Sequence, residues 1–360
     1  MVDWTKSMQQ TFEYYIVDPK TWKDKQILKN VKSCKINRDS SVDTLGSATI
    51  DITESVGECY IRVYLIVTQN GITSKHPLGT YLVQTPASSF NGKIRSVSMD
   101  AYTPLLELTE NQPPIGYFIP KNTNVMDIAY MLTRENTRAP VVKAISDTEL
   151  SFDFTADTSD TWLSVIRDLI SAAYDEKTNK KATYQFDIDE LGHILFTPKQ
   201  DITSLQPVWI YDDNNSSILY PDLDMEHDLY GIPNVVEVSY SNGKNSYYAK
   251  VKNEDKNSPV SIPNRGREIL YRVTNPDVIV TSNDQLQQYA EQLLRELSSV
   301  EYTVTYKHGY CPTRVGDCIR LNYSRAGLTN IKAKIISQSI TCEPGCPVTE
   351  KAVFTSKLWG

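Results

Sequence analysis

The alternation of apolar and polar residues around two Asn-Gly pairs constrains this chain most. Residues 79–102 read GTYLVQTPASSFNGKIRSVSMDAY, with alternating arms on both sides of Asn91-Gly92. Both residues of an Asn-Gly pair tolerate positive φ angles, so the pair predicts the turn of a β-hairpin. The pair Asn70-Gly71 follows another alternating arm. We therefore expect this part of the chain to form antiparallel strands joined by short turns.

The β pattern extends over about the first 110 residues. Apolar side chains such as Ile61, Val63 and Leu65 recur at every second position, which places them on one buried face of a strand. The earlier strands are predicted at residues 11–17, 27–37, 47–53 and 60–68. Several short strands with regular turns and no helix between them favour a small barrel or sandwich.

The middle of the chain has a different pattern. A Pro-Pro pair at 113–114 interrupts the β pattern, and Asn124 is a suitable N-cap for a short helix. From Ser159 onward, apolar residues at helical spacing predict a second helix. Two strands joined around Leu191-Gly192 follow this helix. The middle part is therefore predicted to be a small α+β domain.

Strand patterns return from residue 232, around one further helix whose predicted N-cap is Asn283. The later strands are predicted at residues 301–306, 318–323, 331–340 and 352–358. A weak internal similarity links the two ends, because Gly79 and Gly316 each open a predicted strand, a polar loop and a second alternating strand. We therefore predict a mainly β fold with α+β insertions. Residues 1–110 and 231–360 form two β-barrel regions, the second with the long helix, and residues 111–230 form the α+β domain with an acidic linker segment.

Composition and charge exclude several classes of function. With 40% hydrophobic and 22% charged residues, the chain has the composition of a folded protein. The formal net charge is −7 and no basic stripe is present, so we expect no sequence-specific binding of nucleic acid. The N-terminal residues lack a basic leader, and no apolar run approaches the roughly 20 residues of a membrane span. We expect neither a secretory signal nor a membrane partner.

No arrangement of residues predicts catalysis, a cofactor or a metal. The histidines are scattered, and Asp187 and Asp189, a conceivable acid–base pair, are typical of a hairpin turn. The cysteines lack the paired spacing of structural zinc, so we interpret them as small buried apolar residues. The role of the turn from Cys342 to Cys346 stays open. The six cysteines are Cys34, Cys59, Cys311, Cys318, Cys342 and Cys346.

One segment contains as much net negative charge as the whole chain. Residues 201–230 contain no Lys or Arg and include the carboxylates Asp201, Asp212, Asp213, Asp222, Asp224, Glu226 and Asp228. A calcium loop is disfavoured because the required glycine and the distal glutamate are missing at the expected offsets. Two interpretations stay open: a solvated loop, and the acidic wall of a cavity or channel.

The order of the elements resembles that of a known family. The N-terminal β region ends in MDAYTPLLELTEN, a helix opens with NTNVMDIAYML, and AEQLLRELS precedes VEYTVTYKHG and VGDCIRLNY. This order resembles the baseplate hub and tail-associated proteins of tailed bacteriophages and related contractile injection particles, over nearly the whole chain. The most specific part is Arg314-Val315-Gly316-Asp317, which opens a strand in the manner of a hub β-barrel.

The resemblance implies a homotrimer in which each subunit gives two related barrels to a ring of near six-fold symmetry. Such a ring lies in the virion tail among other baseplate proteins and joins a hexameric tail tube protein to a trimeric spike or fibre. DNA passes through its lumen, and a wall of carboxylates does not attract phosphate. The candidates to line this channel are Asp212, Asp213, Asp222, Asp224 and Asp228.

Two other functions stay open: a carbohydrate-binding or receptor-binding tail module and, less favoured, a cell-wall hydrolase. The 22 tyrosines supply aromatic faces on which sugars stack, but most lie in predicted strands and are better explained by strand packing. Trp209, near the acidic segment, is the best candidate for a sugar contact. The sequence does not distinguish a contractile tail from a long flexible one.

Overall fold

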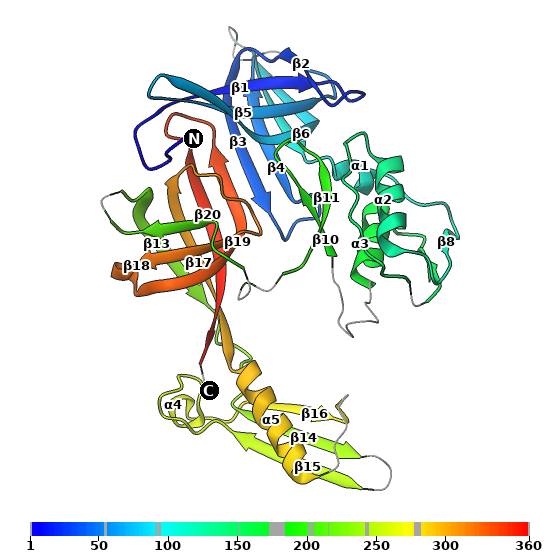
Figure 1. The fold of residues 1–360 in the computed structure, drawn as a ribbon, viewed down its shortest axis with the longest axis vertical. Coiled ribbons are helices and arrows are strands. Elements are labelled where there is room, and N and C mark those ends of the chain that lie inside the picture. Colours follow the sequence, from blue (N-terminus) through cyan, green and yellow to red (C-terminus); the bar gives the residue numbers. More distant parts are fainter. Residues whose placement is uncertain are drawn as a thin grey trace. The chain divides into compact units, whose positions relative to one another are not determined.

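The computed structural model describes residues 2–53, 56–90, 92, 95–150, 152–172, 184–200, 202, 205–214, 216–241, 245–276 and 282–358. The chain forms two compact units (Figure 1). The first unit contains residues 1–222 and 306–351, and the second contains residues 223–305 and 352–360. Within the described part, no helix is long and apolar enough to cross a membrane.

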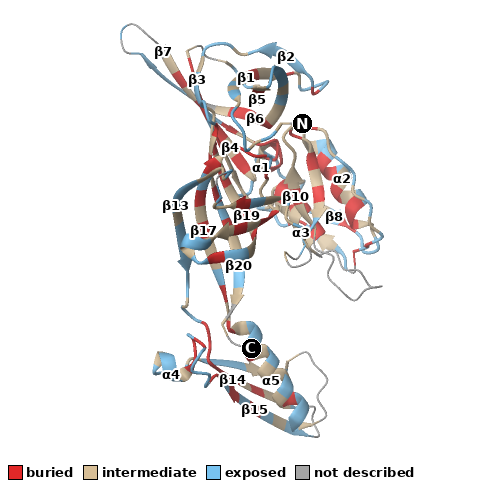
Figure 2. Ribbon diagram, turned by 60° about the vertical axis from the view of Figure 1, so that its left-hand side comes forward, coloured by how far each residue is buried: buried red, intermediate tan, exposed pale blue. Residues whose placement is uncertain are grey.

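The N-terminal region is an antiparallel sheet in the first unit. Its strands are β1 (Gln9–Val17), β2 (Asp24–Ile27), β3 (Val31–Asp39), β4 (Gly46–Ile52), β5 (Tyr60–Gln69), β6 (Ile72–Phe90) and β7 (Arg95–Tyr102). They lie in the order β3-β4-β7-β6-β5-β1-β2. Ile61, Val63 and Leu65 are fully buried, as their alternation predicts. Figure 2 shows buried residues along β4 of the same sheet. The single strand predicted over residues 27–37 is interrupted, because Asn30 adopts a left-handed φ of 62° between β2 and β3.

The two Asn-Gly pairs lie between consecutive strands of this sheet. Asn70 and Gly71 adopt positive φ angles of 52° and 77° and join β5 to β6, which confirms the first turn. Strands β6 and β7 are antiparallel, as predicted, but Asn91 lies outside the described residues. Gly79 does not open a strand. It lies inside β6, next to a β-bulge that shifts the pairing with β5.

The helical part of the first unit packs against part of the N-terminal region. It contains α1 (Leu106–Glu110), α2 (Val125–Asn136) and α3 (Trp162–Ala172), with β8 (Phe118–Ile119), β9 (Phe154–Thr155), β10 (Tyr184–Ile188) and β11 (Ile194–Pro198). The Asn124 side chain accepts a hydrogen bond from the backbone N of Asp127 at 3.0 Å, which confirms the predicted N-cap. The helices share a hydrophobic core with Trp22, Tyr60 and Leu82 of the N-terminal region.

Further strands join the N-terminal sheet from the second half of the chain. They are β12 (Trp209–Asp212), β13 (Leu219–His227), β17 (Ser299–Gly309), β18 (Cys318–Tyr323), β19 (Leu328–Thr341) and β20 (Pro347–Lys357), with η1 (Ser324–Ala326) between β18 and β19. Their order is β12-β18-β19-β20-β17-β13, and β19 also pairs with β3. Both ends of the chain therefore share one 13-stranded sheet. Among the described residues this sheet is not closed into barrels, so the fold is mainly β and the two-barrel arrangement stays a prediction.

The second unit contains a small sheet in the order β15-β14-β16. Its elements are β14 (Val235–Ser241), β15 (Ser246–Lys252), α4 (Ile262–Arg265), β16 (Leu270–Thr274) and α5 (Asn283–Leu297). The buried side chains of Leu286, Ala290 and Leu294 on α5 share a core with β14 and β15. The N-cap of α5 is Ser282, whose side chain accepts from the backbone N of Gln285, and not the predicted Asn283.

The two compact units differ from the sequential domains predicted at 1–110, 111–230 and 231–360. Each of the three passages of the chain between the units falls inside a long strand: β13, β17 or β20. A strand that continues from one compact region into the next gives no break in its alternating pattern. The sequence therefore offers no boundary signal at these positions, and the predicted domain limits remain predictions.

Candidate functional site

The acidic segment contributes two strands to the sheet. Asp212 ends β12, which pairs in parallel with β18, and its Oδ1 accepts a hydrogen bond from Asn322 Nδ2 at 2.7 Å. Asp213 Oδ2 accepts from the backbone N and the hydroxyl of Ser324. The hydrogen bond from the Ser324 hydroxyl is the main cause that lowers the pKa of Asp213. These two carboxylates hold the β12 end against β18 and its following turn.

The remaining candidates lie on or just after β13. Asp222, Asp224 and Glu226 are exposed and occupy every second position, so their side chains point to the same side of the strand. On the other side, His227 stacks on Tyr302 with ring centroids 4.9 Å apart, and Tyr302 stacks on Phe354 at 5.1 Å. The two sides of β13 therefore differ: one carries carboxylates, and the other contributes to an aromatic stack.

The interpretation of this segment as a solvated loop is wrong for residues 219–227, which form a strand. β13 has only one neighbouring strand among the described residues and so lies at an edge of the sheet. Charged side chains are common on edge strands because they prevent pairing with other chains. Asp228 follows the strand, is exposed and accepts from the backbone N of Tyr230 at 2.7 Å. Asp201 lies outside the described residues.

A second group of polar side chains, which we call the Glu350 cluster, is buried in the same sheet. Glu350 on β20 is fully buried. Its Oε2 accepts hydrogen bonds from the hydroxyls of Tyr306 at 2.7 Å and Tyr211 at 3.1 Å. Its Oε1 accepts from Thr313 Oγ1 at 2.7 Å and from Gln338 Nε2. The carboxylate is therefore satisfied on both oxygens without water.

His308 on β17 completes the Glu350 cluster as its cation. Its Nε2 lies 3.3 Å from Glu350 Oε2, and both side chains are fully buried. Burial by itself lowers the pKa of His308, but the charge of Glu350 outweighs it and raises the pKa to about 10. Burial raises the pKa of Glu350, but the charge of His308 and the donated hydrogen bonds lower it to about 2. At neutral pH the two groups form a buried ion pair.

The Glu350 cluster also brings Cys311 close to His308, as in a Cys–His–Glu catalytic arrangement. The Cys311 sulfur lies 4.0 Å from His308 Nδ1, and this nitrogen is also 2.6 Å from the backbone oxygen of Gly309. A charged imidazole donates from both nitrogens, so it cannot accept the thiol proton. Cys311 is buried, in the loop that connects β17 to β18. The side chains of His308, Cys311 and Glu350 are all buried in the described structure.

The turn between β10 and β11 makes polar contacts between the α+β part and the N-terminal sheet. The backbone oxygen of Leu191 accepts from Trp22 Nε1 at 2.8 Å and from Arg62 Nη2 at 3.0 Å. Gly192 has a φ of +80°, and a Cβ at this position would lie 2.7 Å from the Thr80 Cβ. The predicted turn thus needs glycine for its conformation and for this close approach.

The same turn forms ion pairs with the loop between β17 and β18 and with β3. Glu190 Oε1 lies 2.9 Å from Arg314 Nε and 3.6 Å from Arg38 Nη1. Arg314 also contacts the Asp187 carboxylate at 3.3 Å. Asp189 Oδ2 lies 2.7 Å from His193 Nδ1 within the turn. Asp187 and Asp189 thus have separate partners, as expected for residues that stabilise a turn.

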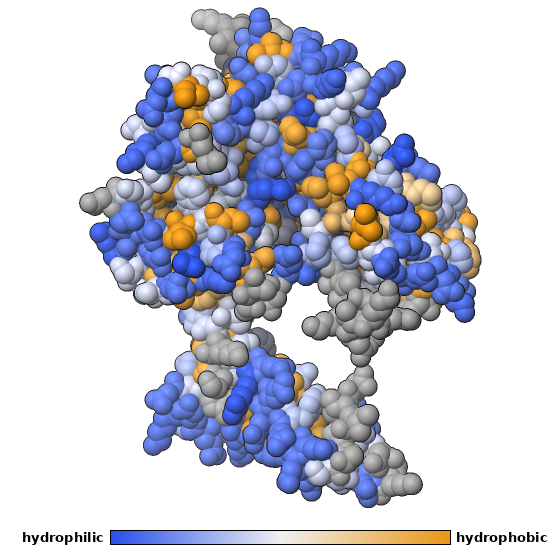
Figure 3. All heavy atoms as spheres, in the orientation of Figure 1, coloured by the Kyte–Doolittle hydropathy of each residue, from blue (hydrophilic) through white to orange (hydrophobic). Residues whose placement is uncertain are grey.

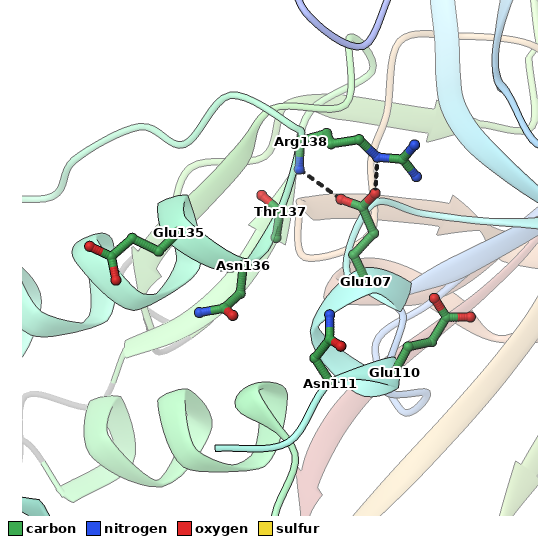
Figure 4. A pocket seen from close by; sticks show the side chains of 7 residues that line it. All are labelled: Glu107, Glu110, Asn111, Glu135, Asn136, Thr137 and Arg138. Carbon is green, nitrogen blue, oxygen red and sulfur yellow. Dashed lines mark hydrogen bonds and ion pairs between the residues drawn. The ribbon is translucent and has the colours of Figure 1, made fainter. Parts of the chain in front are cut away.

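A shallow pocket of about 340 Å³ lies between α1 and the end of α2 and is lined by Glu107, Glu110, Asn111, Glu135, Asn136, Thr137 and Arg138. Glu107 accepts hydrogen bonds from the backbone N and the Nε of Arg138 (Figure 4). Glu110 and Glu135 point away from this pair and from each other. In the described ranges, no three His, Cys, Asp or Glu side chains are grouped to hold a metal.

Several aromatic residues considered for sugar stacking are buried, whereas others, such as Tyr230, Tyr248 and Tyr271, are exposed. Trp209 is partly buried on β12 and lies 6.5 Å from the buried Tyr211 ring. Tyr14, Tyr60 and Tyr64 are buried in the N-terminal sheet, consistent with strand packing. The face seen in Figure 3 is mostly hydrophilic, with apolar side chains in small separate groups.

The sequence matches no family model and no curated protein. Its fold, however, is similar to solved structures. The tail protein from Neisseria meningitidis MC58 covers 97% of this chain and 98% of its own, with a TM-score of 0.59 and 11% identity. The 43 kDa tail protein of prophage MuSo2 from Shewanella oneidensis covers 95% and 98%, with a TM-score of 0.58 and 12% identity. The resemblance to tail proteins is therefore confirmed for the fold.

Proposed function

We propose that this chain is a structural hub subunit of a bacteriophage tail or baseplate, or of a related contractile particle. The observation that carries the proposal is the fold shared with two tail proteins over at least 95% of this chain. Three copies form a ring in the virion tail. The ring joins the hexameric tail tube to a trimeric spike or fibre and contacts other baseplate proteins.

The internal chemistry supports a structural role. The N-terminal strands, the turn at residues 189–192 and the C-terminal strands of the first unit are connected by buried or partly buried polar contacts. Fully satisfied polar networks make a protein interior rigid and specify one arrangement. A rigid subunit suits a ring that transmits force between a tube and a spike. The Cys–His–Glu grouping of the Glu350 cluster is buried, in keeping with a structural role.

Mass measurement and binding test the assembly. Native mass spectrometry of the purified chain should give a species of three subunits, and immobilised tail tube protein should retain it. A single-chain mass at every concentration would contradict the trimer. Release of soluble fragments from cell walls would instead support the hydrolase, and retention on cell-wall polysaccharide would support the carbohydrate-binding module.

We extend the proposal to the channel. The exposed carboxylates of β13 and the residues beside it form the surface that repels phosphate as DNA passes. The candidate residues are Asp212, Asp213, Asp222, Asp224 and Asp228. A cryo-EM map of the ring gives the distance of each carboxylate from the three-fold axis. Positions on the lumen wall are expected, and positions on the outer rim would refute the lining while leaving the hub assignment intact.

A further inference from the structure

Two cysteines far apart in sequence face each other across β3 and the end of β19. In the register of these antiparallel strands, Ile340 lies opposite Ile36 and Thr341 lies opposite Lys35. One step further, Cys342 lies opposite Cys34, and the backbone N of Cys342 donates to the Cys34 oxygen at 2.9 Å. The pair closes a loop that includes most of the chain.

Directly opposed residues of an antiparallel pair suit a disulfide. Their Cα atoms are about 5.5 Å apart when the pair is hydrogen-bonded, which lies within the range of disulfide-linked cysteines, about 4.4–6.8 Å. Both side chains point toward the same core as Ile36 and Ile340. The geometry therefore brings the two sulfur atoms to one side of the sheet.

The surroundings distinguish the two thiols from the other cysteines. A hydrogen bond with the Cys342 thiol is the largest cause that raises the pKa of Cys34, followed by burial. Burial raises the pKa of the neighbouring Tyr14, and both thiols contribute further to the increase. Cys346 is fully buried, and burial raises its pKa, but no hydrogen bond with Cys342 contributes to the shift. The backbone N of Cys342 donates across the strands to Cys34, whereas the backbone N of Cys346 donates within its own turn, to the Glu343 oxygen at 2.8 Å.

We propose that Cys34 and Cys342 are a redox modification site. They form a cross-strand disulfide with each other by thiol–disulfide exchange with a small molecule such as oxidised glutathione. Cys342 is only partly buried, so its thiolate attacks first and forms a mixed disulfide while one glutathione thiolate leaves. The Cys34 thiolate then attacks the Cys342 sulfur, and the second glutathione leaves. The two protein thiols lose two protons and two electrons, and one glutathione disulfide is reduced to two thiols.

The disulfide would fasten the N-terminal sheet to the C-terminal strands at the point where β3 and β19 meet. A link that closes a long loop removes more freedom from the unfolded chain than a link that closes a short one. The reduced protein in a reducing cytoplasm and the oxidised protein outside the cell would thus differ in stability without a change of fold. The formation of the link does not depend on the proposed function, whereas its occurrence outside the cell rests on it.

The test uses the purified full chain, oxidised with glutathione disulfide at mildly alkaline pH. Remaining thiols are then blocked with an alkylating reagent under denaturing conditions, without reduction. Intact mass should show the loss of two hydrogen atoms and four alkylated cysteines. Peptide mapping should find Cys34 linked to Cys342, and the oxidised protein should melt at a higher temperature than the reduced protein.

Matched variants identify the partners. Cys346→Ser should still form the link, whereas Cys34→Ala and Cys342→Ala should not. The wild-type peptide map decides the question even if a variant fails to fold. Six alkylated thiols after oxidation, a glutathione adduct on Cys342 that never closes to Cys34, or a link from Cys342 to Cys346 would each overturn the proposal.

Discussion

Carboxylates occupy two opposite environments in this protein. Glu350 on β20 is fully buried, paired with His308 and hydrogen-bonded on both oxygens. Asp222 and Asp224 on β13 are exposed at an edge of the same hydrogen-bonded sheet. The chemical group is the same, but the number of donors around it differs. The comparison distinguishes carboxylates that stabilise the fold from exposed carboxylates that can interact with another molecule.

The two environments also differ in what their loss would do. Removing one partner of a buried ion pair leaves an uncompensated charge in a medium that cannot solvate it. Removing an exposed carboxylate changes only a surface charge, which water and salt already screen. The Glu350 cluster should therefore determine stability, and the acidic side of β13 should determine interactions.

The largest expected effect is that of Glu350→Gln. The amide NH₂ would face groups that already donate, and His308 would lose its counter-charge. We expect a loss of about 3–5 kcal/mol in the free energy of unfolding, measured by urea denaturation. The matched control is Asp224→Asn on β13, which should leave the free energy nearly unchanged. Equal effects of the two substitutions would remove the distinction between the two regions.

The second prediction is a loss of stability at alkaline pH. The pKa of His308 is raised to about 10 in the folded protein, so its contribution is complete below the unfolded value of 6.5 and is lost as pH rises toward 10. Melting temperatures between pH 6.5 and 10 should fall more steeply for the wild type than for His308→Gln. If the melting temperatures of the wild type and of His308→Gln fell in parallel with pH, His308 would not be charged in the folded protein.

The same reasoning predicts a loss of stability at acidic pH. The pKa of Glu350 is lowered to about 2, so its contribution is present above the unfolded value of 4.5 and is lost as pH falls toward 2. Wild-type stability should decrease over this interval more steeply than that of Glu350→Gln. A slope that the substitution leaves unchanged would assign acid unfolding to other carboxylates.

A smaller effect is expected at the turn that joins the α+β part to the sheet. Gly192→Ala introduces a Cβ that would lie 2.7 Å from the Thr80 Cβ at a φ of +80°. Overpacking of this kind costs about 1–3 kcal/mol, in addition to the cost of the left-handed backbone. Gly71→Ala is the control, because its φ is +77° and nothing lies within 4 Å of the added Cβ. The difference between their denaturation midpoints measures the close approach alone.

The smallest effect on stability, with the clearest effect on interactions, is expected for charge reversal on β13. The variant Asp222→Lys with Asp224→Lys should fold like the wild type, because both side chains are exposed. It should bind double-stranded DNA in a salt-dependent manner that the wild type lacks, measured by fluorescence anisotropy at increasing salt. Absence of any gain in binding would argue against this side of the strand as a surface past which DNA moves.

Local patterns were sufficient to predict much of the fold. The turn at Asn70-Gly71, the N-cap at Asn124 and the buried row through Ile61, Val63 and Leu65 follow from residues close together in sequence. β13 was not predicted as a strand, because an edge strand with exposed carboxylates lacks the apolar alternation that identifies a buried strand. Periodicity detects burial, and this strand is largely exposed.

The Glu350 cluster was not predictable because its members come from separate strands. Tyr211, His308 and Glu350 lie on β12, β17 and β20, and only the strand order brings them together. A signal does exist in the sequence, since a glutamate within the alternating strand at 347–357 occupies a position that should be buried. Such a position requires a partner, but the sequence alone does not identify His308.

The hub assignment is tested most directly by a cryo-EM reconstruction of the distal end of an assembled tail that contains this chain. The account predicts three copies in a ring between the tail tube and the spike or fibre, with β13 carboxylates toward the lumen. A map that places the chain outside this ring, as single copies on the periphery of the baseplate, would contradict the assignment.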